Sequence, residues 1–382
     1  MWNAQIGDIT DLDLECTTFC NLACPECNRT TDEEIISSIL NTTHITLENC
    51  RDWFKPTELT SLTDVRFCGA IDEALMNPEL TDILDFFKDD FKIEFIDIRT
   101  NGSVRSTKWW STLVNHLPTK HTVIFGIDGL EDTLHIYRVG ADYQKVINNA
   151  KAFIATGGMA SWQFIEFEHN KHQVDEARQL AKELGFKEFR LVSSSRPTMS
   201  EDLEHIRKDD KVSALSNKVS TKVETKPARV VIHEPAQESK QEIVLIRKKE
   251  VKKERTVIQC EAQGAIDTGN RILINALSQC VPCCFLNGYL HQPVAHNKDT
   301  KNSDKPPFTF YEDPRLAELY HKHADSQNEL TGISLKHNTL KEILEGPFFA
   351  DIQNSWSTEN PVERCLEVCG KFIKDEAETV NF

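Results

Sequence analysis

The sequence lacks any apolar stretch approaching the roughly 18 residues that a membrane-spanning helix requires. Its first residues, MWNAQIGDITDLD, are acidic and have none of the character of a secretion signal. We therefore expect a cytoplasmic protein that does not bind a membrane. No internal repeat is present. A phosphate-type glycine loop is also missing, which disfavours a nucleotide substrate.

Basic residues are fewer than acidic ones. The chain has 44 Lys and Arg against 60 Asp and Glu, for a formal net charge of −16 at pH 7. This balance disfavours tight, nonspecific binding to nucleic acid, so we expect no nucleic-acid partner. A local basic patch is still compatible with it, and the run RKKEVKKER (247–255) is the candidate.

Cysteine, by contrast, is abundant. The 382 residues include 12 cysteines, and in a chain without a secretion signal these favour metal or redox chemistry over a disulfide framework. A hydrophobic content of 39% with 20 Phe provides enough apolar material for well-packed cores. The length predicts about two or three domains.

Short apolar runs alternate with amphipathic segments from Leu12 to about Arg196. Repeated units of this length predict a parallel sheet with right-handed crossovers, with functional residues at the strand ends. We predict strands at 11–16, 63–69, 93–102, 121–129, 161–170 and 187–195, and helices at 80–91, 107–117, 143–158 and 172–186.

Polar stretches stand at the predicted strand ends. They are CNLACPEC (20–27), CGAIDEA (68–74), RTNG (99–102), GIDG (126–129) and EHN (168–170). Because parallel strands end at one edge of a sheet, we expect these stretches to lie close together.

The first cysteine cluster has the spacing Cys20-x3-Cys24-x2-Cys27. A disulfide, a zinc ion and an iron–sulfur cluster are the candidates. Zinc needs a fourth ligand, whereas three thiolates on a [4Fe–4S] cluster leave one iron open for a cofactor or substrate. We interpret Cys16 as a buried strand residue rather than a fourth ligand, and Cys50 and Cys68, which have no cysteine nearby, as core residues.

This loop, placed after the first strand of a β/α series, resembles that of the radical S-adenosylmethionine (radical SAM) enzymes. The resemblance covers most of residues 12 to 195. It implies a partial (β/α)6 barrel, a [4Fe–4S] cluster and S-adenosylmethionine chelated to the fourth iron. An electron from a flavodoxin- or ferredoxin-type donor would then yield a 5′-deoxyadenosyl radical that abstracts hydrogen from the substrate.

The family's Gly-Gly-Glu-Pro motif corresponds to CGAIDEALMNPEL (68–80). Gly69 matches the motif, whereas Ala74 stands where proline is expected. The resemblance assigns Glu73 to the methionine ammonium, with Asp72 as the substitute. The alternative is that both acids cap the following helix.

Residues at the later strand ends are further candidates. Asn101 and Asp128 are predicted either to reach the adenosine or substrate or to satisfy turn backbone. Arg138 is predicted to pair with a carboxylate of cofactor or substrate, or to form a surface ion pair. His169 and Asn170 close the fifth strand and are predicted to face the mouth of the barrel.

The last cysteines resemble a SPASM or twitch-like domain, a small α+β unit of hairpin plus helix that binds auxiliary iron–sulfur clusters. The match includes RILINALSQCVPCC (271–284) as the hairpin and 334–356 as the helix, although Ser278 replaces the usual turn glycine. A structural zinc in the same thiolates is the alternative. The resemblance implies one auxiliary cluster, with ligands Cys260, Cys283, Cys365 and Cys369 and with Cys284 or Cys280 as alternates.

These features predict three parts: a radical SAM partial barrel (1–196), a charged linker or excursion (197–256) and the cluster domain (257–382). The resemblance implies an oxidoreductase or maturase-like enzyme that oxidises or cross-links a peptide or protein side chain. Alternatives are a radical dehydrogenase of a small molecule and an RNA-modifying radical SAM enzyme. A zinc-stabilised, non-catalytic binding protein is the alternative from another class.

Overall fold

The structure is a computed structural model. It describes residues 5–25, 27, 43–68, 72–193, 256–258, 270–283, 286, 314–325, 330–358, 361, 362, 365 and 370–372. The predictions for Gly69, Cys260, Cys284, Cys369 and the segment 197–255 lie outside the described residues.

The central element is an eight-stranded, mostly parallel sheet in the order β6-β5-β4-β3-β2-β1-β8-β9. All six strands predicted for the barrel are present, and each pairs in parallel with its neighbour in the chain. Strands β6 and β9 stand at the two ends of this order, so the sheet is an open one. The barrel strands are β1 (Ile9–Leu14), β2 (Asp64–Phe67), β3 (Phe95–Thr100), β4 (Lys120–Gly126), β5 (Ala160–Glu166) and β6 (Glu188–Ser193).

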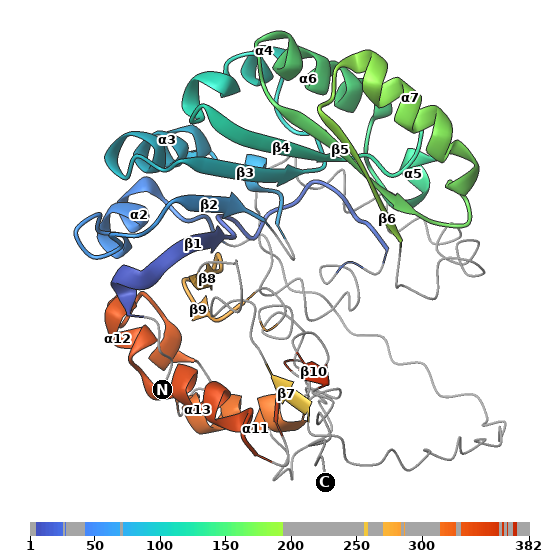
Figure 1. Cartoon of the computed structure of the whole chain (residues 1–382). Coiled ribbons are helices and arrows are strands. Elements are labelled where there is room, and N and C mark those ends of the chain that lie inside the picture. The colour runs from blue at the N-terminus through green and yellow to red at the C-terminus, as the bar shows by residue number, and fades with distance from the viewer. Residues whose placement is uncertain are drawn as a thin grey trace, which may run out of the picture.

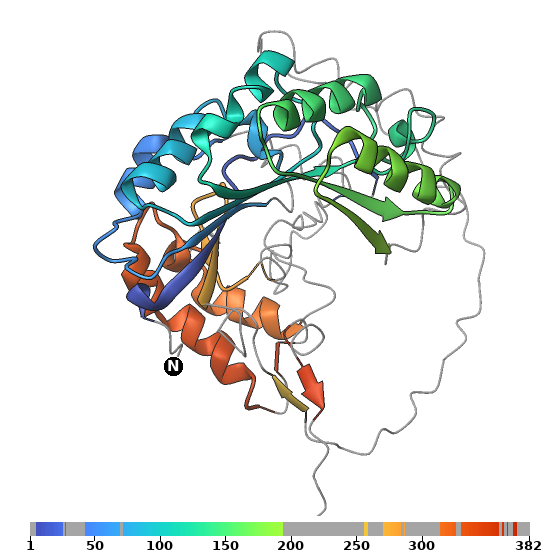
Figure 2. The same cartoon turned by 45° about the horizontal axis from the view of Figure 1, so that its top comes forward.

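Helices cover the outer, convex face of the curved sheet (Figures 1 and 2). The side chains that point toward them are apolar and buried, as with Leu12, Val65, Ile96 and Phe125 on successive strands. Burying one such side chain contributes about 1.5–3 kcal/mol. The helices are α2 (Leu47–Trp53), α3 (Leu80–Asp85), α4 (Thr107–Trp110), α6 (Tyr143–Ala155) and α7 (Val174–Leu184).

Two of the predicted helices are less regular than their sequence pattern indicates. The segment 80–91 is α3 followed by a π-helical turn, Phe86–Asp90, and the segment 107–117 is α4 followed by a 3-10 turn, Leu113–His116. The predictions for α6 and α7 are confirmed. Helix α7 ends at Gly185 in the left-handed conformation (φ 87°), the usual helix-ending role of glycine.

The C-terminal segment joins the same sheet. Strand β8 (Asn270–Ile274) pairs in parallel with β1, and β9 (Cys280–Val281) pairs antiparallel with β8, which confirms the predicted hairpin. Helices α11 (Pro314–His323), α12 (Leu340–Leu344) and α13 (Pro347–Ser355) share one apolar core with these strands and with β1. The domain boundary at 257 stays a prediction, because the described parts on either side of it share a sheet and a core.

The helix expected at 334–356 is two short helices. Helix α12 starts at a capping box between Thr339 and Glu342, and α13 starts after Gly346 with Pro347 in its first turn. Proline is favoured there because its missing N–H needs no partner in the first helical turn.

The turn between β8 and β9 contains a non-glycine residue in the left-handed conformation, Ser278, with φ 69°. For a residue with a Cβ, this conformation costs roughly 1–2 kcal/mol. Glycine avoids that cost, but its greater freedom in the unfolded chain offsets part of the gain in stability. We expect Ser278→Gly to raise the free energy of unfolding by about 1 kcal/mol in urea denaturation. Ser278→Ala, which keeps the Cβ, is the control and should give no gain. Equal stability of Ser278→Gly and the wild type would contradict the strain argument.

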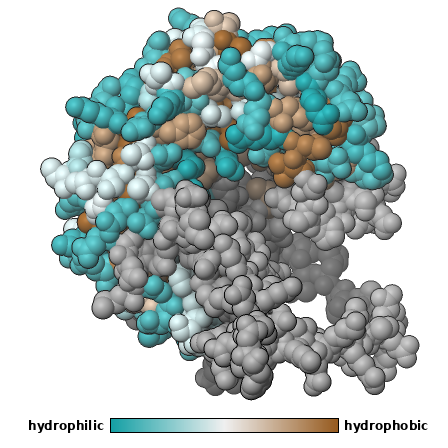
Figure 3. All heavy atoms as spheres, in the orientation of Figure 1, coloured by the Kyte–Doolittle hydropathy of each residue, from teal (hydrophilic) through white to brown (hydrophobic). Residues whose placement is uncertain are grey.

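The outermost barrel strand, β6, carries the exposed large apolar side chains of the described surface. Leu191 is 44% exposed and Val192 is 38% exposed. Figure 3 shows a hydrophobic area at this end of the sheet, on a surface that is otherwise mostly hydrophilic. Among the described residues, no helix is both long and apolar enough to cross a bilayer.

Candidate functional site

The cysteine loop lies at the carboxyl edge of the sheet, directly after β1. Cys24 is 8% exposed and belongs to a small apolar cluster with Tyr137 and Phe167. Cys20 and Cys27, both half-buried, pack against the same cluster. The structure therefore brings the three predicted thiols together in one apolar environment.

Hydrogen bonds from neighbouring strand ends hold this loop. The amide of Asn101, after β3, donates to Asn21 Oδ1 at 2.9 Å and to Cys20 Sγ at 3.9 Å. Asn21 Nδ2 in turn donates to Ser103 Oγ at 2.8 Å. On the other side, the Ala23 N–H donates to a backbone carbonyl in the segment after β4 at 3.0 Å.

A buried ion pair lies beside the loop. Arg138 Nε donates to Asp128 Oδ2 at 2.7 Å, and the Asp128 carboxylate is completely buried. Asp128 Oδ1 also accepts from the N–H of Ile165 on β5, at 2.7 Å. Arg138 thus forms an ion pair with a buried carboxylate of the fold, while its own side chain is 19% exposed.

Arg138 also acts on the thiol of Cys24. Burial raises the pKa of Cys24 to about 11, while the adjacent guanidinium favours the thiolate and works against that increase. A metal ligand must be a thiolate, and a fixed cation nearby lowers the cost of forming one in an apolar site.

The thiol chemistry of the loop fits an iron–sulfur cluster. Three cysteines on one short loop match the predicted ligand number, and they pack against apolar side chains. Within the described ranges, no three His, Cys, Asp or Glu side chains converge as closely as a single metal ion needs. The thiolates of a cubane bind different irons, so they stand farther apart than the ligands of one ion.

Glu73 is buried, and its carboxylate joins the ends of β2 and β3. It accepts hydrogen bonds from Thr100 Oγ1 and the Asn101 N–H, both at 2.7 Å, and it caps the 3-10 turn that follows through the Leu75 N–H. The capping role left open by the sequence is therefore present for Glu73. Burial raises the pKa of Glu73, and these donors oppose that increase. Burial raises the pKa of the Cys16 thiol, and the nearby Asp72 carboxylate raises it further.

The other candidates at the strand ends differ in what they contact. Asn101 Oδ1 accepts from the Ser103 N–H and hydroxyl, so this residue both closes its own turn and contacts the cysteine loop. Asn170 is fully buried and donates to the backbone carbonyls of Asp128 and Ile165, which makes it a turn residue.

His169 stacks on Phe167, with ring centroids 5.4 Å apart and an interplanar angle of 12°. Its two ring nitrogens are buried and have no hydrogen-bond partner among the described residues. Burial and two neighbouring histidines lower its pKa, so the ring is neutral at pH 7. It therefore lies next to an aromatic ring of the cysteine cluster, with unused hydrogen-bonding capacity.

The cysteines predicted to be structural fall into two groups. Cys16 and Cys50 are fully buried, and burial raises the pKa of both thiols. The prediction of core positions is confirmed for these two. Cys68 is half-buried.

The structure describes three of the six predicted auxiliary cysteines. Cys280 is fully buried on β9, where burial raises the pKa of its thiol well above the ordinary value. Cys283 is half-buried and Cys365 is 8% exposed, and both contact the main apolar core.

The two remaining predicted ligands adjoin a described strand pair in the sequence. Strand β7 (Thr256–Ile258) pairs antiparallel with β10 (Gly370–Phe372), with Ile258 opposite Gly370. Cys260 comes two residues after Ile258 in the sequence, and Cys369 immediately precedes Gly370.

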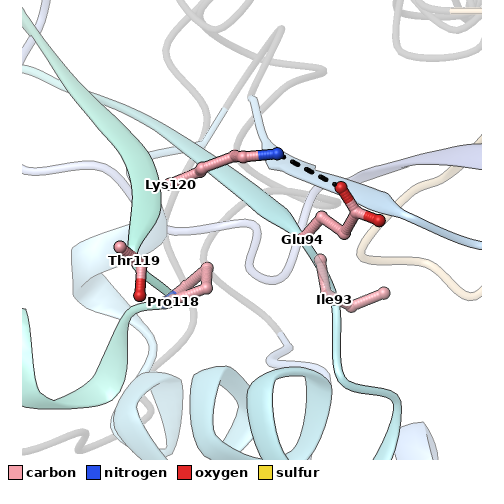
Figure 4. Close-up of a pocket in the computed structure, with 5 residues that line it drawn as sticks. All are labelled: Ile93, Glu94, Pro118, Thr119 and Lys120. Carbon is pink, nitrogen blue, oxygen red and sulfur yellow. Dashed lines mark hydrogen bonds and ion pairs between the residues drawn. The ribbon is translucent and has the colours of Figure 1, made fainter.

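A pocket at the opposite edge of the sheet is unrelated to these residues. It is lined by the amino-terminal ends of β3 and β4 and the turns before them, and Lys120 Nζ pairs with Glu94 Oε2 across it at 3.3 Å (Figure 4). None of the predicted site residues lines it. Its lining residues are Ile93, Glu94, Pro118, Thr119 and Lys120.

The sequence did not reveal several contacts of the loop. Asn21, Ser103 and Tyr137 were not among the predicted site residues, although each contacts the loop or its apolar cluster. The position of Asn21 between Cys20 and Cys24 was the available signal for the first. Nothing in the sequence indicated the other two, because their contacts join separate strand ends.

Comparisons with known proteins give weak matches. No protein-family model and no curated protein matches the sequence. Among solved structures, SuiB of Streptococcus suis bound to precursor peptide SuiA aligns over 94% of this chain and 76% of its own, with TM-score 0.46 and 12% identity. SuiB bound to S-adenosylmethionine aligns over 84% and 69%, with TM-score 0.44 and 13% identity. Native anSMEcpe with bound AdoMet aligns over 49% and 52%, with TM-score 0.40 and 17% identity. Likeness at this level does not establish a family.

Proposed function

We propose that this protein is a radical S-adenosylmethionine enzyme that modifies a peptide or protein side chain. Cys20, Cys24 and Cys27 would bind a [4Fe–4S] cluster whose fourth iron takes S-adenosylmethionine. When bound, these groups supply a 5′-deoxyadenosyl radical that abstracts a hydrogen atom from the substrate. The observation that carries the proposal is the convergence of the three thiols in one apolar cluster at the carboxyl edge of a parallel sheet.

The surrounding residues have supporting roles in this proposal. Asn101 and Asn21 fix the loop through side-chain hydrogen bonds, and Arg138 places a cation next to the Cys24 thiolate. Glu73 and Asp128 are already hydrogen-bonded, and a carboxylate can accept further donors, so both can still orient polar groups of the cofactor.

The outermost barrel strand favours a peptide over a small molecule as substrate. Among the described residues, β6 pairs with β5 alone, so no described strand pairs with its other edge. Peptides commonly add to such edges by main-chain hydrogen bonds, with neighbouring side-chain contacts providing specificity. The exposed side chains of Leu191 and Val192 would provide the apolar contacts.

The proposal includes one auxiliary cluster on Cys260, Cys283, Cys365 and Cys369. The pairing of β7 with β10 supports it, because these strands adjoin two of the four cysteines in the sequence. Cys280 is omitted because its thiol is fully buried in the core.

The test is anaerobic reconstitution with iron, zinc and sulfide counted per chain, followed by dithionite and S-adenosylmethionine. We expect about eight irons (two [4Fe–4S] clusters) and release of 5′-deoxyadenosine. Cys369→Ala should lose about one cluster and keep measurable cofactor cleavage. Unchanged iron in that variant would refute the auxiliary cluster. Zinc at both sites without deoxyadenosine would refute the enzyme and support a structural role.

A further inference from the structure

The inner face of the sheet, opposite the helices, is lined with charged side chains. Asp13, Arg66, Asp97 and Thr122 stand in one register row across β1 to β4. Side chains alternate between the two faces of a strand, and the intervening residues point into the apolar core. The row therefore faces away from the helices, into the concave side of the sheet.

Most of the acids on this face are paired. Arg66 Nη1 lies 2.5 Å from Asp11 Oδ1 and 3.7 Å from Asp13 Oδ1. Arg271, on β8, lies 3.5 Å from Asp11 and 3.9 Å from Asp13. These groups neutralise one another within the fold.

Asp97 is the exception. It is 7% exposed, and its Oδ1 has no hydrogen-bond partner among the described residues. None of the described Lys, Arg or His nitrogens comes within 4.0 Å of its carboxylate. A buried carboxylate without a partner is costly, and one that a fold keeps calls for an explanation such as a bound ion or a catalytic role.

Three arginines act on the Asp97 carboxylate from a distance. Burial raises the pKa of Asp97, and the positive charges of Arg99, Arg66 and Arg190 oppose this increase. Arg190 is on β6, three strands away from β3, so its charge acts across the concave side of the sheet. Arg99 is exposed. Asn101, four residues beyond Asp97 and about 13 Å along the strand direction, contacts Cys20.

We propose that Asp97 binds a cationic group of the substrate, an ammonium or guanidinium, whose chain extends along β3 toward the cysteine loop. The location of the reacting end rests on the proposed function, whereas the cation site itself does not. A cation is favoured over an anion because the buried group without a hydrogen bond is a carboxylate. The arginines nearby are already paired: Arg66 and Arg271 with Asp11 and Asp13, and Arg190 with Glu188.

The test is calorimetric titration of the reconstituted protein with N-acetyl-lysine amide and its uncharged counterpart, N-acetyl-norleucine amide. We expect the lysine compound to bind at least about tenfold more tightly, as for other charge-paired contacts in buried sites. Asp97→Asn should remove that preference without weakening the norleucine compound. Asp64→Asn, another acid of the same face, is the matched control and should keep the preference.

Three results would overturn the proposal: equal affinities in the wild type, no binding of the lysine compound, or a preference that survives in Asp97→Asn. The melting temperature distinguishes a lost site from a lost fold, because removing an unpartnered buried charge should leave it unchanged or raise it. Iron content should be unchanged in Asp97→Asn. If the wild type itself binds no cluster, the proposed function fails, and the same titration on the metal-free protein still tests Asp97.

Discussion

Replacing Cys24 by alanine should abolish the barrel cluster and all reductive cleavage of S-adenosylmethionine. Cys24 is the most buried of the three loop cysteines, and its thiol lies next to the guanidinium of Arg138. Without Cys24, two thiolates remain on the loop. Two thiolates can bind only two irons of a cubane, whereas the proposed cluster has three irons bound by cysteine and one open. Iron and sulfide analysis, the visible absorbance of the cluster and chromatography of 5′-deoxyadenosine measure the loss.

Cys50→Ala is the matched control for this experiment. It also removes a buried thiol, but from α2, in the main core and outside the cysteine cluster. We expect it to keep full iron content and cleavage. If Cys24→Ala cleaves the cofactor, the assignment of the loop is wrong. If both variants lose iron equally, the loss reflects folding rather than ligation.

Replacing Asp128 by alanine should destabilise the protein by about 3 kcal/mol, because it leaves the Arg138 cation, only 19% exposed, without its partner. The Ile165 N–H would also lose its acceptor. Urea denaturation of the metal-free protein under reducing conditions measures this cost separately from any loss of cofactor binding.

Two further variants make the result specific. Asp128→Leu combined with Arg138→Met removes both charges, and we expect this pair to recover most of the lost stability. Asp175→Ala breaks the exposed ion pair with Arg178, which lies on the surface of α7, and should leave the unfolding midpoint within experimental error. An Asp128→Ala variant as stable as Asp175→Ala would show that the buried pair is not needed for folding.

Much of the barrel could be predicted from the sequence because its signals are local. Alternating apolar residues identified the six parallel strands, and the amphipathic pattern identified α6 and α7, with Gly185 ending α7. The same reasoning was less precise where packing overrides the local pattern. The segment 80–91 changes to π-helical geometry at Phe86, whose ring packs edge-on against Phe87 and Phe91.

The candidate site, like the fold, could be predicted from the sequence only in part. The spacing of Cys20, Cys24 and Cys27 is a local pattern that indicates a three-thiolate ligand set, and the strand-end rule predicted that the polar stretches would meet. The sequence could not predict which of them touch. The hydrogen bond of Asn101 to the loop spans 80 residues, and its geometry depends on the register of β3 against its neighbours.

The sequence by itself determined the strand order of the barrel, the position of the thiols at one edge and the burial of Cys16 and Cys50. Only the tertiary structure decided that β8 continues the barrel sheet and that Arg138 pairs with the buried Asp128 beside Cys24. It also decided that Asp97 Oδ1 has no hydrogen-bond partner among the described residues. The physical reason is the range of the interactions. Hydrophobic periodicity acts over a few residues, whereas the pairing of buried charges depends on which strands the closed core places side by side.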